Sequence, residues 1–345
     1  MKVALEATCE MEQTEHLADL VRRDHPSLRA LPLHPDGKYQ RRLVTAAHLT
    51  GAVQECLADA FRGRAPEDFP RLYCAWGKAR VGSTALNNLF GLSGLPSYYQ
   101  PTKAILRCAL ADAPLAPWQP PSAKDHPALF SKETAGPYLV AECLYNPLQL
   151  LIEAGYPADR IHLILLDREP TACLSSWFAK WSDRVPERTL VENFVLASLN
   201  IWRVRNFARR HGVPVTHYVY EASKDPKASV EALFRRLGLR DRFDPAILTD
   251  WQGIDRLDAT ESSIRFPDEP NVFAVPGLHS STSAYRYRQR TAAAPVEAYM
   301  DLLHRTGLYD TYFHSVERCA ADLDLSPDTA ARLFGHASPW LSSAA

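Results

Sequence analysis

The strongest constraint on the fold is a short stretch at residues 160–167, which reads RIHLILLD. Its centre is continuously apolar, which is typical of a strand covered on both faces in a parallel sheet. Gly155 and Pro157 break the chain before it, and a helical pattern runs from about residue 171 to Trp181 after it. A strand of this kind needs a neighbour on each side, so the stretch predicts an α/β fold.

The rest of the chain supplies further strands and helices that alternate with short connections. Strand patterns lie at residues 71–76, 128–131 and 214–220. Helical patterns lie at Ala46–Phe61, from near Gly82 to about Gly94, at 146–154, at 190–212, at 228–237, and from about residue 295 onward. The alternation predicts a parallel central sheet flanked by helices.

The pattern also suggests how the chain is organised. Residues 1–70 are predicted to form a helical N-terminal extension that packs on a core domain of residues 71–345. Residues 110–127 are rich in proline and alanine, which predicts an irregular loop. Residues 250–290 are polar and irregular as well, and Ser326 begins a helix in the last segment.

The charge balance and the cysteines argue against several classes of site. The 345-residue chain has a formal net charge of −1, so no overall field draws it to nucleic acid or an anionic membrane. Its seven cysteines are scattered without a C-x-x-C pair, which predicts neither a metal site nor a disulfide framework. The N-terminus carries acids where a signal peptide is apolar, and no stretch reaches the roughly 20 apolar residues of a membrane span. We therefore expect a soluble, cytoplasmic protein.

The first of two motifs with chemical meaning is WGKARVGST at residues 76–84. A loop that leaves a strand and enters a helix presents unpaired N–H groups and the positive end of the helix dipole to an anion. Gly77 and Gly82 let the backbone approach a ligand, while Ser83 and Thr84 add hydroxyl donors. The motif predicts a phosphate-binding loop; the alternative is a glycine turn with incidental charge.

The cations of this motif differ from those of the Walker A pattern, G-x-x-x-x-G-K-[ST]. The spacing of Gly77 and Gly82 is kept, but Ser83 stands where the phosphate-binding lysine would be. Lys78 and Arg80 supply the positive charge instead, and an arginine can bind two oxygens of one anion at once. This departure weakens an NTPase interpretation and still favours phosphate binding.

The second motif is DREPTACLSS at residues 167–176. Arg168 directly follows the predicted strand, so it lies at the carboxyl edge of the sheet, where open α/β folds bind ligands. Ser176 lies about two helical turns further on and can face the same space. A guanidinium and a hydroxyl that converge suit a second phosphate, although both residues are also common at such positions.

With both motifs in view, the chain resembles the family of sulfotransferases that use 3′-phosphoadenosine 5′-phosphosulfate (PAPS). The family's phosphosulfate loop reads roughly [RK]-S-G-[ST]-T, and residues 80–84 match it except at Val81, where the family usually has serine. Its 3′-phosphate motif reads R-x-P-x-x-x-x-x-S, which Arg168, Pro170 and Ser176 match. Residues 219–221, 225–226 and 237–239 resemble the stretch after the family's late core strand, so the resemblance covers about residues 71–240.

The resemblance implies a Rossmann-like P-loop fold, no metal requirement and two groups of ligand residues. It assigns the phosphosulfate to Arg80, Gly82, Ser83 and Thr84, and the motif itself adds Lys78 and the backbone N–H of Val81. The 3′-phosphate would be held by Arg168 and Ser176, and by Arg286 and Arg288 if residues 250–290 cover the site. For Arg286 and Arg288 the alternative is a solvated basic face.

Sulfuryl transfer needs fixed cations near the bridging oxygen of the leaving nucleotide and a base for the proton of the acceptor. Arg80 is the candidate cation, with Lys132 or Lys78 assisting. The family's basic histidine, in a K-x-H segment, is replaced by threonine in the KET segment at 132–134, and Gln100 stands where other members have a glutamate. Glu133 is therefore the first candidate for the base and His126 the second.

The expected activity is transfer of the sulfuryl group of PAPS to a hydroxyl or amine of a small soluble acceptor. A second interpretation is a P-loop kinase or other phosphotransferase, which the missing Walker lysine disfavours. A third is a sulfotransferase-like protein that binds nucleotide without catalysis, which the missing histidine favours. No pattern predicts the oligomeric state.

Overall fold

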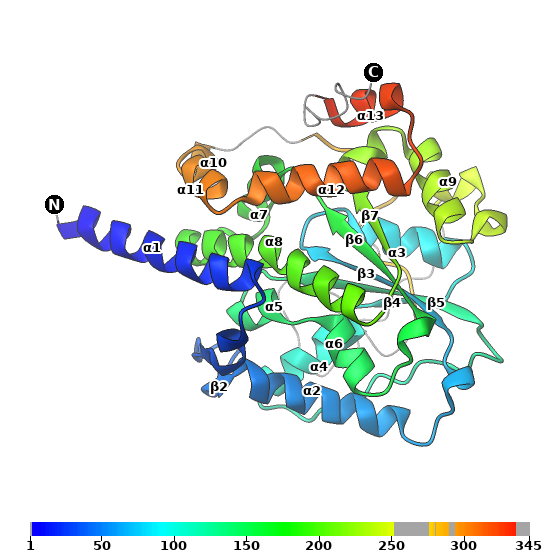
Figure 1. The fold of residues 1–345 in the computed structure, drawn as a ribbon, viewed down its shortest axis with the longest axis horizontal. Coiled ribbons are helices and arrows are strands. Elements are labelled where there is room, and N and C mark those ends of the chain that lie inside the picture. Colours follow the sequence, from blue (N-terminus) through cyan, green and yellow to red (C-terminus); the bar gives the residue numbers. More distant parts are fainter. Residues whose placement is uncertain (1, 252–275, 280, 290–293, 336–345) are drawn as a thin grey trace.

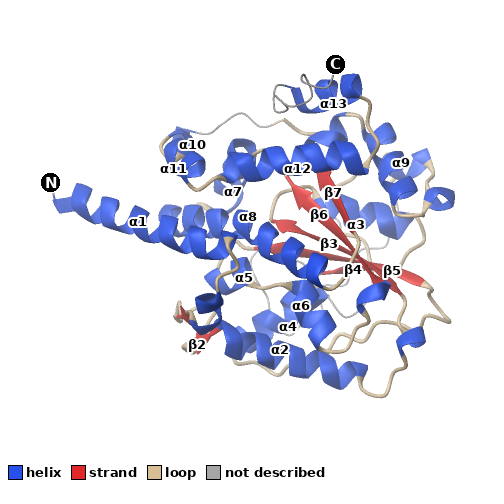
Figure 2. Cartoon of the chain, viewed as in Figure 1, coloured by secondary structure: helices blue, strands red, loops and turns tan. Residues whose placement is uncertain are grey.

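The computed structural model describes residues 2–251, 276–279, 281–289 and 294–335, with side chains from residue 12 onward except at Ala294 (Figure 1). A five-stranded sheet lies at its centre, and every strand is parallel to its neighbours in the order β4-β5-β3-β6-β7. The strands are β3 (Arg71–Lys78), β4 (Ser97–Tyr99), β5 (Ala128–Ala135), β6 (Ile161–Asp167) and β7 (Val215–Val219). Helices surround this sheet (Figure 2). The predicted α/β fold with a parallel central sheet is therefore confirmed.

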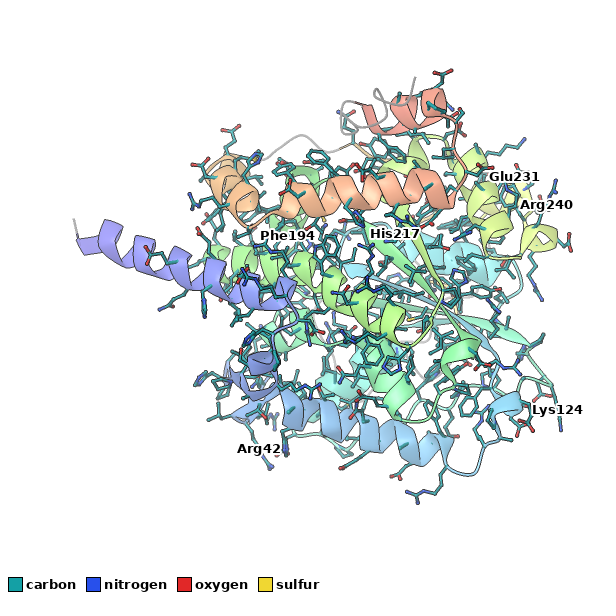
Figure 3. All side chains as sticks on the ribbon, in the orientation of Figure 1. Arg42, Lys124, Phe194, His217, Glu231 and Arg240 are labelled. Atoms are coloured by element: carbon teal, nitrogen blue, oxygen red, sulfur yellow. The ribbon has the colours of Figure 1, made fainter. Side chains whose placement is uncertain are left out.

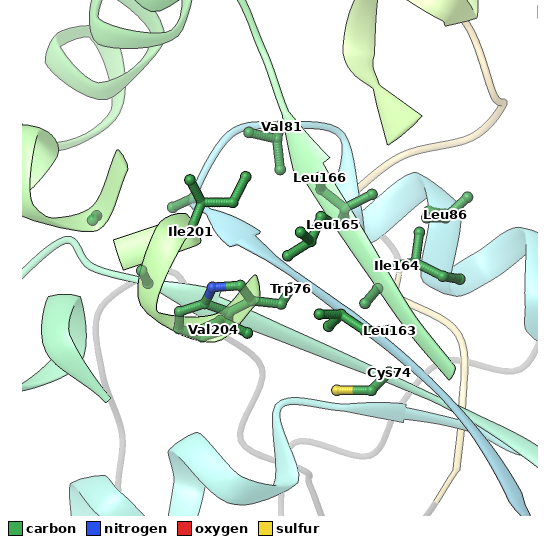
Figure 4. Close-up of a cluster of buried hydrophobic side chains, with 14 of the residues drawn as sticks. Cys74, Trp76, Val81, Leu86, Leu163, Ile164, Leu165, Leu166, Ile201 and Val204 are labelled. Carbon is green, nitrogen blue, oxygen red and sulfur yellow. The ribbon is translucent and has the colours of Figure 1, made fainter. Parts of the chain in front are cut away.

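The central strands are apolar on both faces because a helix layer covers each face. Figure 4 shows Trp76 of β3 beside Val204 of α8 (Glu187–Arg210), with Leu163 of β6 in the same cluster. On the opposite face the ring of Phe90, from α3 (Ser83–Leu92), stacks 4.1 Å from the ring of Phe130 on β5. The continuous apolar stretch of β6 is thus explained by burial from two sides.

The remaining helices complete the two layers and the two ends of the chain. Charged side chains such as Arg42, Lys124, Glu231 and Arg240 lie at the periphery, whereas Phe194 lies inside (Figure 3). The helices other than α3 and α8 are α1 (Lys2–Arg22), α2 (Ala46–Phe61), α4 (Pro101–Leu110), α5 (Val140–Leu144), α6 (Pro147–Glu153), α7 (Pro170–Trp181), α9 (Pro226–Arg236), α10 (Ala294–Glu297), α11 (Met300–Arg305), α12 (Leu308–Asp322) and α13 (Pro327–Phe334).

The first 70 residues lie against the core through their helices. Helix α1 packs along α8, and α2 packs on α4 and α6 (Figure 1). A short antiparallel pair, β1 (Pro32–Leu33) with β2 (Val44–Thr45), connects them. Among the described residues, no helix has both the length and the apolar character needed to cross a membrane.

Several elements differ from the sequence prediction. Strand β5 extends to Ala135 instead of ending at residue 131, because its polar residues at 132–134 are buried against other elements. The short strands β1, β2 and β4 and the helices α4 and α5 were not predicted at all. The expected irregular segment at 250–290 lies largely outside the described residues.

Gly77 allows β3 and β6 to approach each other closely. A Cβ atom at this position would lie 2.3 Å from the carbonyl oxygen of Leu166, closer than any real side chain tolerates. The glycine therefore has a packing role in the sheet, one residue before the sheet edge at Lys78.

We expect Gly77→Ala to lower the free energy of unfolding by about 1–3 kcal/mol, the usual effect of overpacking, because β3 and β6 must separate. Gly51→Ala is the matched control: it lies in α2, and a Cβ there meets nothing within 4 Å. That control should raise stability by about 0.5–1 kcal/mol through helix propensity. Urea unfolding measures both, and a Gly77→Ala protein as stable as the wild type would contradict the close approach.

Candidate functional site

The loop between β3 and α3 adopts a conformation that few residues tolerate. Arg80 and Gly82 both have left-handed backbones, with φ of 72° and 82°. A Cβ atom on Gly82 would lie 2.8 Å from the ring of Tyr220, so only glycine fits there. The carbonyl oxygen of Ala79 accepts a hydrogen bond from the indole N–H of Trp177 at 2.8 Å, which fixes the loop to α7.

The two sequence motifs meet at this loop. Arg168, directly after β6, donates from a terminal guanidinium nitrogen to the carbonyl oxygen of Arg80 at 3.0 Å. The Nε of Arg80 in turn donates to the hydroxyl of Ser176 on α7, also at 3.0 Å. The guanidinium of Arg168 therefore contacts the loop backbone, and the guanidinium of Arg80 contacts α7, both at the carboxyl edge of the sheet. Ser83 and Thr84 follow in the first turn of α3.

Arg168 is held inside the protein while one of its donors stays unused. The side chain is 5% exposed and its guanidinium lies 4.3 Å from the ring centre of Tyr220. Its Nε has no hydrogen-bond partner among the described residues. A buried charged donor without a partner is uncommon in native structures, and an anion at this point would satisfy it.

Lys78 was predicted to bind the ligand at the loop, and the structure corrects this prediction. Its ammonium is buried in an ion pair with Asp167 at the end of β6 and faces the ring of Phe194. Burial alone would lower the pKa of Lys78, but the adjacent Asp167 carboxylate raises it above its ordinary value. Asp167 also accepts hydrogen bonds from the backbone N–H of Arg168 at 2.8 Å and from the hydroxyl of Ser315 at 2.7 Å. Lys78 is therefore a structural cation behind the loop.

The ammonium of Lys132 lies near Thr84, at the start of α3. The hydroxyl of Thr84 lies 3.4 Å from that of Tyr99, and the ammonium of Lys132 lies 3.7 Å from the centre of the Tyr99 ring. The ring of His279 packs against the same tyrosine at 4.9 Å. Of the two lysines considered from the sequence, Lys132 is thus the one near Thr84.

The carboxylate of Glu133 is buried and accepts hydrogen bonds at the start of α4. Its carboxylate is 1% exposed and accepts hydrogen bonds from the backbone N–H of Thr102 at 2.8 Å, the N–H of Lys103 at 3.2 Å and the Tyr145 hydroxyl at 3.0 Å. Burial raises its pKa, and these donors oppose the rise. The residue therefore caps the N-terminus of α4, and its assignment as the base is corrected.

His126 is also corrected, because it lies at the wrong edge of the sheet. It is exposed two residues before β5 begins, whereas the loop follows the carboxyl ends of the strands. Since β3 and β5 run parallel with Arg71 paired to Ala128, the full length of β5 separates His126 from that edge. The histidine cannot reach a ligand at the loop.

The late basic segment reaches the site through its backbone. The N–H of Arg288 donates to the hydroxyl of Tyr220 at 3.0 Å, and the Tyr287 ring lies 5.4 Å from the Tyr220 ring. The segment thus packs against Tyr220, whose ring also contacts the guanidinium of Arg168. The side chains of Arg286 and Arg288 lie at the surface.

Sequence reasoning gave no site role to Tyr220 and Glu221, which directly follow β7. Glu221 is 6% exposed, its Oε1 accepts the N–H of Glu169 at 3.3 Å, and burial raises its pKa. A usable signal was present, since residues after neighbouring parallel strands share one edge. The packing of Tyr287 on Tyr220 could not have been predicted, because it joins segments far apart in the chain.

A cavity of about 570 Å³ lies elsewhere, between residues 24–33, α2, α6 and the end of α8. No residue of the loop or of the strand ends described above lines it. Two of its cations, Arg203 and Arg210, bind Asp24 at 2.9 and 3.2 Å. The donors at the loop, and not this cavity, identify the candidate site. Within the described residues, no group of three or more histidine, cysteine, aspartate or glutamate side chains is placed to hold a metal ion.

Comparison of the chain with protein-family models, with curated proteins and with solved structures finds no match. The functional conclusion therefore depends on the residues and their geometry.

The ion pair behind the loop gives a prediction about stability. Asp167→Asn strands the buried ammonium of Lys78 without a counter-charge, and we expect it to lower the free energy of unfolding by about 3–5 kcal/mol. The double variant with Lys78→Met removes that charge and should recover most of the loss. Urea unfolding distinguishes them, and equal loss in the single and double variants would show that the pair is not the cause.

Proposed function

We propose that this protein is a sulfotransferase that moves the sulfuryl group of PAPS to a small hydroxyl or amine acceptor, in a P-loop-like fold. The observation that carries the proposal is the convergence of Arg80, Arg168 and Ser176 on one loop at the carboxyl edge of the sheet. These residues come from two separate motifs, and a ligand with phosphate groups at two places is suited to both. PAPS is such a ligand.

The binding model assigns each phosphate to one part of the site. The 5′-phosphosulfate lies over the loop, where the N–H groups from Val81 to Thr84 and the hydroxyls at the start of α3 face it. The 3′-phosphate lies at Arg168 and Ser176, where the unused Nε of Arg168 supplies a donor. Arg80 lies beside both phosphates in this binding model, because its backbone belongs to the loop and its side chain contacts Ser176.

The chemical step is an in-line displacement at sulfur. The acceptor oxygen or nitrogen forms a bond to sulfur as the bond from sulfur to the bridging oxygen breaks, and 3′-phosphoadenosine 5′-phosphate (PAP) leaves. Arg80 and Lys132 stabilise the negative charge that develops on the leaving oxygen. Because Glu133 is held by three donors, an acceptor more acidic than an aliphatic alcohol, such as a phenol, suits this site best, since its proton can pass to solvent as the bond to sulfur forms.

A second candidate is a protein that binds PAPS or PAP without transfer. The state of Glu133 favours it, together with the hydrogen bond from the Thr134 hydroxyl to the side-chain oxygen of Gln100, since neither group offers a free base. Consumption of radiolabelled PAPS over a panel of phenols, alcohols and amines separates the two candidates. Thermal-shift comparison of PAP with ATP and Mg²⁺ tests the phosphotransferase interpretation.

Arg168→Ala is expected to weaken PAP binding about 10- to 100-fold, as loss of a charge-assisted hydrogen bond implies. Isothermal titration calorimetry measures the affinity. Arg160→Ala is the matched control, because Arg160 precedes the same strand at the opposite edge of the sheet and should leave PAP affinity unchanged. If both variants bind PAP like the wild type, the two-phosphate model is wrong.

Glu133→Ala separates a capping role from a catalytic one. It leaves the N–H groups of Thr102 and Lys103 unpaired, so we expect the free energy of unfolding to fall by about 1–3 kcal/mol. Sulfuryl transfer by the folded protein should persist within a few-fold of the wild-type rate. If turnover instead falls by two orders of magnitude or more while stability is unchanged, Glu133 is restored as the base.

A further inference from the structure

Two buried groups of opposite charge lie near one another at the site, and neither is fully paired. Besides the Nε of Arg168, the Oε2 of Glu221 has no hydrogen-bond partner among the described residues. Arg168 and Glu221 are 5% and 6% exposed. Buried ionised groups are usually paired and fully hydrogen-bonded. A ligand at the Nε of Arg168 and a proton on the Oε2 of Glu221 would satisfy these two atoms.

The surroundings of Glu221 fix its position and leave its charge only partly compensated. Its Oε1 accepts the backbone N–H of Glu169, and the Tyr312 hydroxyl from α12 faces the carboxyl group. Arg168 is turned toward the loop carbonyl and the Tyr220 ring. The charged and titratable groups that face Glu221 are Lys78, Arg168, Glu169, Cys173, Tyr287, Tyr312 and Cys319.

We propose that Glu221 takes up a proton when a phosphate binds at Arg168, so that the site admits the 3′-phosphate of the nucleotide and a proton together. This inference rests on the proposed function for the identity of the ligand. The proton comes from solvent and binds the unpaired Oε2, and no other bond forms or breaks.

Binding of a phosphate at Arg168 changes the charge next to the carboxyl group of Glu221. Without a ligand, the positive charge of Arg168 favours the ionised form of the Glu221 carboxyl group. A phosphate dianion at Arg168 neutralises that cation and adds negative charge beside a second buried anion. Burial already raises the pKa of Glu221, and the added anion raises it further. The carboxyl group therefore ends protonated when the phosphate is bound.

Glu221 then acts as a specificity residue for the charge of the ligand. A nucleotide that carries a 3′-phosphate is bound with a proton, and its affinity falls up to tenfold for each unit rise in pH between the pKa of Glu221 in the free protein and its higher pKa in the complex. Adenosine 5′-monophosphate lacks the 3′-phosphate and should bind without this proton.

The test is calorimetric titration of the full chain with PAP at one pH in buffers of different ionisation enthalpy, which gives the number of protons exchanged. Because the free 3′-phosphate titrates near pH 6, the wild type and the variants are compared at the same pH. We expect net proton uptake to be lower in Glu221→Gln than in the wild type. PAP affinity of that variant at pH 8 should equal or exceed that of the wild type, because the repulsive carboxylate is gone.

Glu169→Gln is the matched control, since Glu169 is the adjacent carboxylate and its side chain caps α7 through the N–H groups of Thr171 and Ala172. It should keep the proton uptake of the wild type. Titration with adenosine 5′-monophosphate should show no difference between the wild type and Glu221→Gln.

The outcomes separate the two proposals. Tight PAP binding with the same proton count in the wild type and Glu221→Gln overturns the role of Glu221 and leaves the proposed function intact. Absence of PAP binding by the wild type overturns both. If Glu221→Gln does not fold, Tyr312→Phe replaces it, because loss of that hydroxyl should move the pH dependence of PAP affinity upward; an unmoved profile rejects the inference.

Discussion

The buried ion pair between Lys78 and Asp167 is the interaction on which the site depends. It joins the last residue of β3 to the last residue of β6, so the loop and Arg168 begin from one fixed point. Asp167 also orients the backbone of Arg168, whose side chain then holds the loop through the carbonyl of Arg80. A displaced Asp167 would therefore move the loop and Arg168 together.

The sequence was sufficient for the features that local patterns encode. The apolar stretch of β6 depends on neighbours along the chain, and β6 lies where it was expected. Gly77 lies inside β3, where it allows close packing on β6, and Ser176 contacts Arg80, so the ligand roles of these residues stay predictions. Lys78 and Glu133 were misassigned because their roles depend on partners from distant elements. Neither Asp167 as a counter-ion nor the N-terminus of α4 can be identified from a short stretch around these residues.

Strand β4 and helix α4 were missed for different reasons. Strand β4 is three residues long, which is too short for a clear periodicity, whereas α4 begins at a proline after a left-handed Gln100 whose side chain makes no capping hydrogen bond to mark the start. Tertiary contacts stabilise them instead: β4 pairs with β5, and Glu133 caps α4. The same kind of long-range packing brings Tyr287 to Tyr220.

The strand order has a consequence for how the protein is made. β3 emerges first among the core strands yet occupies the centre of the sheet, and its partners β5 and β6 are separated from it by long crossovers. During synthesis both edges of β3 stay unpaired until these strands leave the ribosome, which makes the nascent chain prone to aggregation. The loop edge is completed later still, when the segment at 285–288 arrives. Folding dominated by such non-local pairing is slow, so expression yield should benefit from slower translation or chaperones.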